Sequence, residues 1–239
     1  MKTNRALLAA VAAMLLPLGA MAGDNINYTF FDLKYVDNGI DESYSESFEG
    51  ESLSLDVDGS GGFALLGSLA INENWHVFAD YAATDVDLKA SAMLDDLEES
   101  VTIGGDVDDW RIGLGFNTAL GADLDGIVQV AWENRGVDFG SVTVLDETTD
   151  LDLDDDGFGV MIGLRGNLSD SFELNGSVRY SQVLGLDLAA DAEDDILDND
   201  LLYAVGGIYH MDDMFSLGAN VEVGDSSAWY LFARVAFGS

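Results

Sequence analysis

Residues 228–239 read AWYLFARVAFGS, and every second side chain from Trp229 to Phe237 is apolar. Between them stands a second set that includes Arg234. Successive side chains of a β-strand point to opposite faces, so this stretch is a strand with one apolar and one mixed polar face. Such an ending is unexpected in a chain with 45 Asp and Glu against nine Lys and Arg. The question it raises is which environment the apolar face contacts.

The same two-residue alternation recurs along the chain, whereas helical periodicity is hard to find. The only proline, Pro17, precedes all of these segments, which suits long ladders in which nearly every N–H is hydrogen-bonded. The alternation predicts ten strands, at about residues 27–36, 61–71, 75–87, 107–118, 125–137, 157–166, 171–183, 201–210, 214–224 and 228–238.

The connections between these segments alternate in length. Short ones lie near residues 72–74, 119–124, 167–170 and 211–213, and long ones cover residues 37–60, 88–106, 138–156 and 184–200. Short turns at one end and long loops at the other are typical of outer-membrane barrels. The pattern predicts an all-β, closed, up-and-down antiparallel transmembrane barrel of about ten strands. Eight strands are the alternative, because the last hairpin, near Asp225, is short although it falls on the long side.

The first 22 residues have the pattern of a secretory signal peptide. Lys2 and Arg5 form a basic start, an apolar run follows, and Ala20 and Ala22 fit an A-x-A cleavage site. The apolar run is shorter than the roughly 20 residues of a membrane-spanning helix. We therefore expect a signal peptide at 1–22 and one barrel domain at 23–239.

Charge and cysteine content limit the possible partners. Without the signal, seven basic residues stand against 45 acidic ones, so nucleic acid is not an expected partner. Cysteine is absent, so stability must arise without disulfides.

Six of the seven basic residues beyond the signal fall on the strand face opposite the aliphatic one, together with several carboxylates. In a barrel this face looks into the bore, where an unpaired charge is costly, so these groups are expected to pair. The predicted lumen network consists of Asp32, Lys34, Asp80, Arg111, Glu133, Arg135, Arg165, Glu173, Arg179, Glu222 and Arg234.

Aromatic residues on the apolar face gather near both strand ends. Two such rows around an aliphatic band match the girdles that sit at the two membrane interfaces. A soluble β-sandwich would give the same alternation, but it has no reason to arrange aromatics by height. The predicted interface aromatics are Tyr35, Trp75, Tyr81, Trp110, Trp132, Phe172, Tyr180, Tyr203, Trp229 and Phe237.

With the signal, the ten alternating segments and the closing strand, the chain resembles the small bacterial outer-membrane barrels, which include opacity-type adhesins, OmpA-type barrel domains and porin-like proteins. The resemblance covers nearly all of residues 23–239. It implies integral location in the outer membrane of a Gram-negative bacterium, contact with lipid and lipopolysaccharide, and insertion by the barrel-assembly machinery. Family members usually end on a terminal Phe, whereas here Gly238 and Ser239 follow Phe237.

The stretch DLDLDDDGFG places Asp152, Asp154 and Asp156 in the spacing of a calcium loop, followed by Gly157. Position twelve of such a loop is a bidentate Glu, and here it is Gly163. A true EF-hand is thus not expected. No cofactor is predicted, beyond loosely bound Ca²⁺ or Mg²⁺ at the acidic connections, which carry 28 of the 45 acidic residues.

The sequence does not predict an enzyme. Its two histidines, His76 and His210, fall next to short turns, and no general base of this type is available at the opposite rim. The expected role is structural or surface-interactive, with acidic loops displayed outside the cell. A narrow passive channel for ions or small solutes is the main alternative, and an outer-membrane enzyme is a weaker one. The sequence indicates no oligomeric state.

Overall fold

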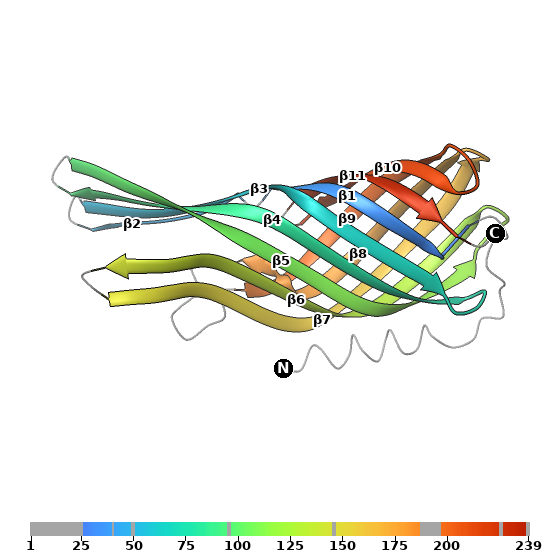
Figure 1. The fold of residues 1–239 in the computed structure, drawn as a ribbon, viewed down its shortest axis with the longest axis horizontal. Coiled ribbons are helices and arrows are strands. Elements are labelled where there is room, and N and C mark those ends of the chain that lie inside the picture. The colour runs from blue at the N-terminus through green and yellow to red at the C-terminus, as the bar shows by residue number, and fades with distance from the viewer. Residues whose placement is uncertain are drawn as a thin grey trace.

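The alternating segments form eleven antiparallel β-strands in a computed structural model (Figure 1). The structure describes residues 26–39, 41–48, 51–94, 97–144, 147–186, 197–224 and 227–237. The predicted signal peptide lies outside the described residues. The strands are β1 (Phe30–Gly39), β2 (Asp41–Phe48), β3 (Glu51–Ala70), β4 (Trp75–Leu94), β5 (Leu97–Ala119), β6 (Leu124–Val144), β7 (Glu147–Ser169), β8 (Phe172–Leu186), β9 (Leu197–His210), β10 (Phe215–Val223) and β11 (Ser227–Ala236).

The sheet closes on itself through its first strand. β1 pairs with β11 on one side and with β3 on the other, and all other neighbours are consecutive in the chain. β2 continues beyond the end of β1 along β3, so it adds length and not a further position around the barrel. The barrel thus has ten strand positions, which confirms the predicted class and number and rejects eight strands. Closure leaves no free edge in the wall.

Short turns join the strands at one end. In the turn after β9, the Asp212 Oδ1 atom accepts hydrogen bonds from the backbone N–H groups of Met214 and Phe215. The N–H groups of Phe215 and Met214 hold the pKa of Asp212 below its usual range. Asn72 closes the turn after β3 in the same way, through the N–H groups of Asn74 and Trp75. Both are turns in which an Asn or Asp side chain replaces a backbone acceptor.

At the opposite end the strands run much further than expected from the sequence. β5 and β7 each have 23 residues, about 75 Å at the usual rise per residue. Most of the predicted loops 37–60, 88–106 and 138–156 are therefore strand. The reason is that alternation continues through them, as in Leu53, Leu55 and Val57. In the predicted loop 184–200, β8 continues to Leu186 and β9 begins at Leu197, and the residues between lie outside the described part.

Among the described residues, no helix is long and apolar enough to cross a membrane. The described elements are all strands, which agrees with the all-β class.

Candidate functional site in the barrel interior

The two faces of the wall have opposite chemistry. Outward side chains are apolar and accessible, as with Ile112, which is 60% exposed. Inward side chains on the same strands are charged and buried, as with Asp32, which is 1% exposed. Apolar groups outside and ionised groups inside reverse the arrangement of a soluble protein core.

Arg234 and Asp32 pair directly across the β1–β11 seam. They stand opposite each other in the strand register. The Arg234 Nε and Nη2 atoms donate to the two Asp32 carboxylate oxygens, each at 2.8 Å. The guanidinium also lies over the Phe30 ring, 3.6 Å from its centroid. A bidentate, stacked arginine of this kind joins the first and last strands of the barrel.

Arg165 and Glu173 form a second bidentate pair near the short-turn end. The Arg165 Nε atom lies 2.7 Å from Glu173 Oε1, and Nη2 lies 2.9 Å from Oε2. His210 Nε2 is 3.7 Å from the same carboxylate. The Arg165 guanidinium lies 4.8 Å from the centroid of the Tyr28 ring. Glu173 is almost fully buried, so this pair is shielded from water.

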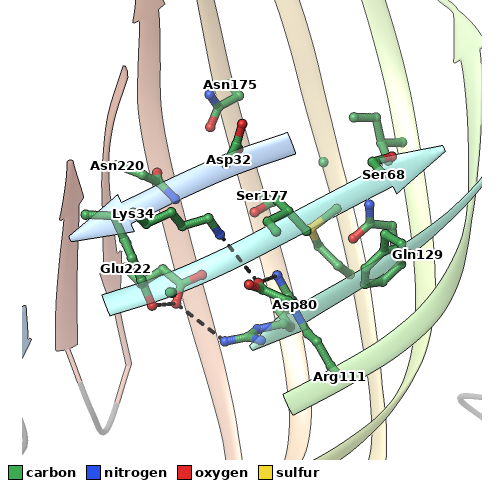
Figure 2. Close-up of a pocket in the computed structure, with 18 of the residues that line it drawn as sticks. Asp32, Lys34, Ser68, Asp80, Arg111, Gln129, Asn175, Ser177, Asn220 and Glu222 are labelled. Carbon is green, nitrogen blue, oxygen red and sulfur yellow. Dashed lines mark hydrogen bonds and ion pairs between the residues drawn. The ribbon is translucent and has the colours of Figure 1, made fainter. Parts of the chain in front are cut away.

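Closer to the long-strand end, Lys34 and Arg111 point at one carboxylate, that of Asp80 (Figure 2). Their nitrogens lie 3.4 Å and 2.8 Å from Asp80 Oδ2. One carboxylate from β4 thus connects β1 with β5.

Arg179 lies between two further carboxylates of the bore. Its guanidinium is 3.6 Å from Glu133 and 3.4 Å from Glu222. In a neighbouring pair, Arg135 donates to Asp109 at 2.7 Å. The sequence reasoning did not select Asp109, although it stands two residues before Arg111 and so shares its inward face.

All eleven residues proposed for the lumen network take part in these contacts, with Asp109 as a twelfth. The sequence assigned no partners within this set. In the structure Glu173 pairs with Arg165, while Arg179 contacts Glu133 and Glu222. The pairing depends on which strands oppose each other across the bore.

Inward glycines make room for bulky neighbours. A Cβ atom on Gly115 would collide with the His76 ring, and one on Gly159 would collide with the Glu133 carboxylate. A Cβ on Gly113 would meet the Phe78 ring. The space beside these three glycines is thus filled by His76, Phe78 and Glu133.

A cavity of about 240 Å³ remains inside the barrel, and the ion pairs lie along its wall. Four buried polar atoms of lining residues have no hydrogen-bond partner among the described residues: Asp80 Oδ1, Glu133 Oε1, Arg179 Nε and Asn220 Oδ1. A polar cavity of this size has room for several water molecules.

Two apolar clusters also lie along the bore. Near the short-turn end, Ile26, Tyr28 and Ile127 pack with Met161, and the Tyr28 hydroxyl donates to Asp125 at 2.9 Å. Beyond the other end of the ion pairs, a four-valine cluster of Val57, Val86, Val107 and Val137 packs with Leu88, Phe139 and Leu153. The four-valine cluster therefore covers the charged section on the long-strand side, whereas at the short-turn end the apolar side chains lie among the charged ones.

Both histidines lie at the short-turn end. The buried His76 ring stacks on Tyr28 at 4.9 Å and contacts Asn117 and Gln129. His210 contacts Ser216 at 2.8 Å as well as Glu173. Each imidazole is thus held by neighbours within the wall, and neither lies at the end where the long strands project.

The ten aromatics proposed for the membrane interfaces lie on the outward face, eight of them exposed and Trp75 and Tyr180 partly buried. Several pack across neighbouring strands. Trp132 and Phe158 meet edge to face at 4.6 Å, and Tyr35 lies 5.4 Å from Trp229. At the other row, Trp75 packs on Phe116 at 5.0 Å. Cross-strand aromatic pairs of this kind also stabilise the wall.

Asp152, Asp154 and Asp156 project from β7 and not from a loop. Alternate residues on one strand face are about 6.6 Å apart, too far to enclose one ion as a calcium loop does. Among the described residues, no group of three or more acidic or His side chains is arranged to hold a metal. Asp152 instead faces Asp138 on β6, which faces Asp106 on β5.

No protein-family model and no curated protein matches this chain. Solved structures do match its fold. The translocator domain of the autotransporter NalP from Neisseria meningitidis is 11% identical, with 98% of this chain and 94% of that chain covered and a TM-score of 0.52. The KdgM porin is 11% identical, over 87% and 99% of the two chains, with a TM-score of 0.42.

The outer membrane protein OprG from Pseudomonas aeruginosa is 10% identical over 89% of this chain and 98% of that chain, with a TM-score of 0.43. The ten-position closed barrel, its outward apolar face and the match to the NalP translocator domain together give one conclusion: this chain has the fold of the outer-membrane β-barrels.

Proposed function

We propose that this protein is a non-enzymatic integral β-barrel of the bacterial outer membrane, with a bore closed by paired charges. In this proposal it acts structurally or through the surface of the strands that project beyond the barrel. The observation that carries the proposal is the lumen network, in which seven basic and acidic pairs connect strands across or along the bore.

The network supports a closed bore for an energetic reason. Each pair lies inside a narrow bore with its side chains largely removed from solvent, so separating the partners leaves an uncompensated charge. An ion that passes through must displace these partners in turn. A barrel of about eight strands is just wide enough to be filled by side chains, and ten strands are only slightly wider.

The projecting strands carry the acidic surface that the sequence assigned to loops. Four carboxylates, Asp85, Asp106, Asp138 and Asp152, stand directly opposite each other on neighbouring strands β4 to β7. All four are exposed. Like charges in such a row repel, so the row costs stability and suggests a role at the surface. Loosely bound Mg²⁺ or Ca²⁺, lipopolysaccharide and the assembly machinery stay predictions as its partners.

A narrow channel is the second candidate, and the cavity favours it. The cavity extends from Tyr28 and His76 near the short-turn end to Glu222 and Val183 toward the end where the long strands project. Its charged lining would select among ions. The two candidates differ in whether the ion pairs block the bore of the unmodified protein or leave a path for ions through it.

Planar-bilayer recording separates them. We expect the purified protein to give no steady conductance above the leak of the bilayer. The triple variant Lys34→Ala, Asp80→Ala and Arg111→Ala removes one complete cluster without leaving a charge unpaired, and it is expected to conduct. Steady conductance of the unmodified protein would contradict the closed bore and favour the channel.

A further inference from the structure

Beyond the barrel the long strands separate into two groups. β5 pairs with β6 only from Asp106, opposite Asp138, to Ala119. Past this point β2, residues 51–59 of β3, residues 86–94 of β4 and residues 97–105 of β5 form one sheet, here called the outer leaf. The β6–β7 hairpin continues separately, and Figure 1 shows the two groups diverging.

The two faces of the outer leaf differ in chemistry. One face carries serine, threonine and charged side chains, for example Ser54, Ser91 and Ser100 in one cross-strand row. The other face is the continuation of the barrel interior. One cross-strand row of this face contains Tyr44, Leu55, Ala90 and Val101, and the next contains Val57, Leu88 and Ile103.

The apolar face is covered at its base and uncovered further out. At the base, the four-valine cluster is buried with Phe139 and Leu153 of the β6–β7 hairpin. Further out, Val101 is 55% exposed in the row of Leu55, and Leu53 is 47% exposed in the row after it. Apolar area left open in continuity with a buried cluster is typical of a binding surface.

The outer leaf also has an open hydrogen-bonding edge next to this face. Residues 97–105 of β5 pair with β4, but no described residue pairs with their other side. The free N–H and C=O groups of such an edge can add a strand from another polypeptide, and the neighbouring face then selects its alternate side chains.

Charge indicates which segment fits. On the serine-bearing face, the exposed Asp58 and Asp87 share the row that ends at Gly104 of the open edge, which is the face that the alternate side chains of an added strand would reach. Lys89 is the only basic residue in the leaf sequence, residues 41–59 and 86–106. A second copy of this edge would bring like charges together, whereas a basic segment complements them.

We propose that the open β5 edge and the adjoining apolar face of the outer leaf bind an extended segment of a partner protein, in which apolar and basic side chains alternate. The segment adds a strand to β5, places its apolar side chains beside Val101 and Ile103, and its basic ones near the leaf carboxylates. This inference names a partner class for the surface role and so rests on the proposed function.

The probe is a synthetic peptide that alternates valine and lysine, titrated against the detergent-solubilised full-length protein. A peptide of the same composition with its valines and lysines in separate blocks controls for charge alone. The alternating peptide N-methylated at every second residue controls for strand addition, because it cannot donate all of its backbone hydrogen bonds. We expect binding of the first peptide only, weakening as salt is raised.

Two variants of β5 test the face. Val101→Thr with Ile103→Thr keeps β-branched side chains but removes apolar area, and is expected to weaken binding roughly tenfold or more. Ser100→Thr with Thr102→Ser changes side chains on the opposite face of β5 and is expected to leave binding unchanged. Heat-modifiable migration on gels shows that each variant keeps its barrel.

Equal binding of the block or N-methylated peptide, equal binding by the Val101→Thr, Ile103→Thr variant, or no binding at all would overturn the proposal. Concentration-dependent self-association that the same variant abolishes would assign the surface to a second copy and overturn it too. Conductance of the same preparation distinguishes a failure of this inference from a failure of the proposed function. A silent bore without peptide binding defeats only this inference, whereas a conducting bore defeats the proposed function.

Discussion

Arg165→Met is expected to lower the free energy of unfolding of the barrel by about 3–5 kcal/mol, because it leaves the carboxylate of Glu173 buried without its bidentate partner. Methionine keeps much of the side-chain volume and removes the charge. The measurement is denaturant unfolding in lipid vesicles, followed by tryptophan fluorescence. His210 lies 3.7 Å from the same carboxylate and does not replace the two short hydrogen bonds.

The double variant Arg165→Met, Glu173→Gln is the matched control. It removes both charges and should recover a large part of the loss, since replacing a whole buried pair costs far less than breaking it. If the single and double variants unfold at the same denaturant concentration, the buried charge is not what stabilises this part of the wall. The account of the network would then be wrong.

Ile112→Lys is expected to destabilise the inserted barrel by about 2–4 kcal/mol, the usual cost of a basic side chain at the midplane of a membrane barrel. Ile112 lies on the outward face of β5, two residues from Trp110 and four from Phe116 in the two aromatic rows. Reversible unfolding in vesicles measures the effect.

Thr102→Lys is its control on the same strand and the same face. Thr102 lies in the outer leaf, beyond the aromatic row, where lysine contacts water, so a change close to zero is expected. Equal small effects at both positions would place Ile112 in water and contradict insertion of this face into lipid.

The strand number and the orientation of the faces could be predicted from sequence because both follow from a local rule. Alternation with a period of two fixes which side chains share a face, whatever the strand pairs with. Arg234 and Asp32 therefore fall on the inward face from their position in the pattern alone. The outward position of Trp229 follows in the same way.

Strand length and charge pairing could not be predicted, because they depend on distant parts of the chain. The alternation of Leu53, Leu55 and Val57 is compatible with a loop until β4 and β5 are seen to pair beside it. Likewise, Arg179 has several inward carboxylates on its face. Only the closed geometry decides that it contacts Glu133 and Glu222 and leaves Glu173 to Arg165.

The interruption between β1 and β2 had no clear sequence signal either. β1 ends at Gly39 and β2 begins at Asp41, and both pair with β3. The register between β3 and β4 shifts at a bulge between Gly59 and Gly62. A bulge bends the strand that contains it, and this bulge lies where the outer leaf diverges from the barrel wall.

The central claim is that the apolar face of this barrel contacts acyl chains. All four tryptophans, Trp75, Trp110, Trp132 and Trp229, stand on that face in the two aromatic rows. The most direct measurement is tryptophan fluorescence of the protein reconstituted in vesicles of lipids brominated along their acyl chains. We expect strong quenching relative to unbrominated vesicles. Fluorescence that is unchanged by the brominated lipids would contradict the account.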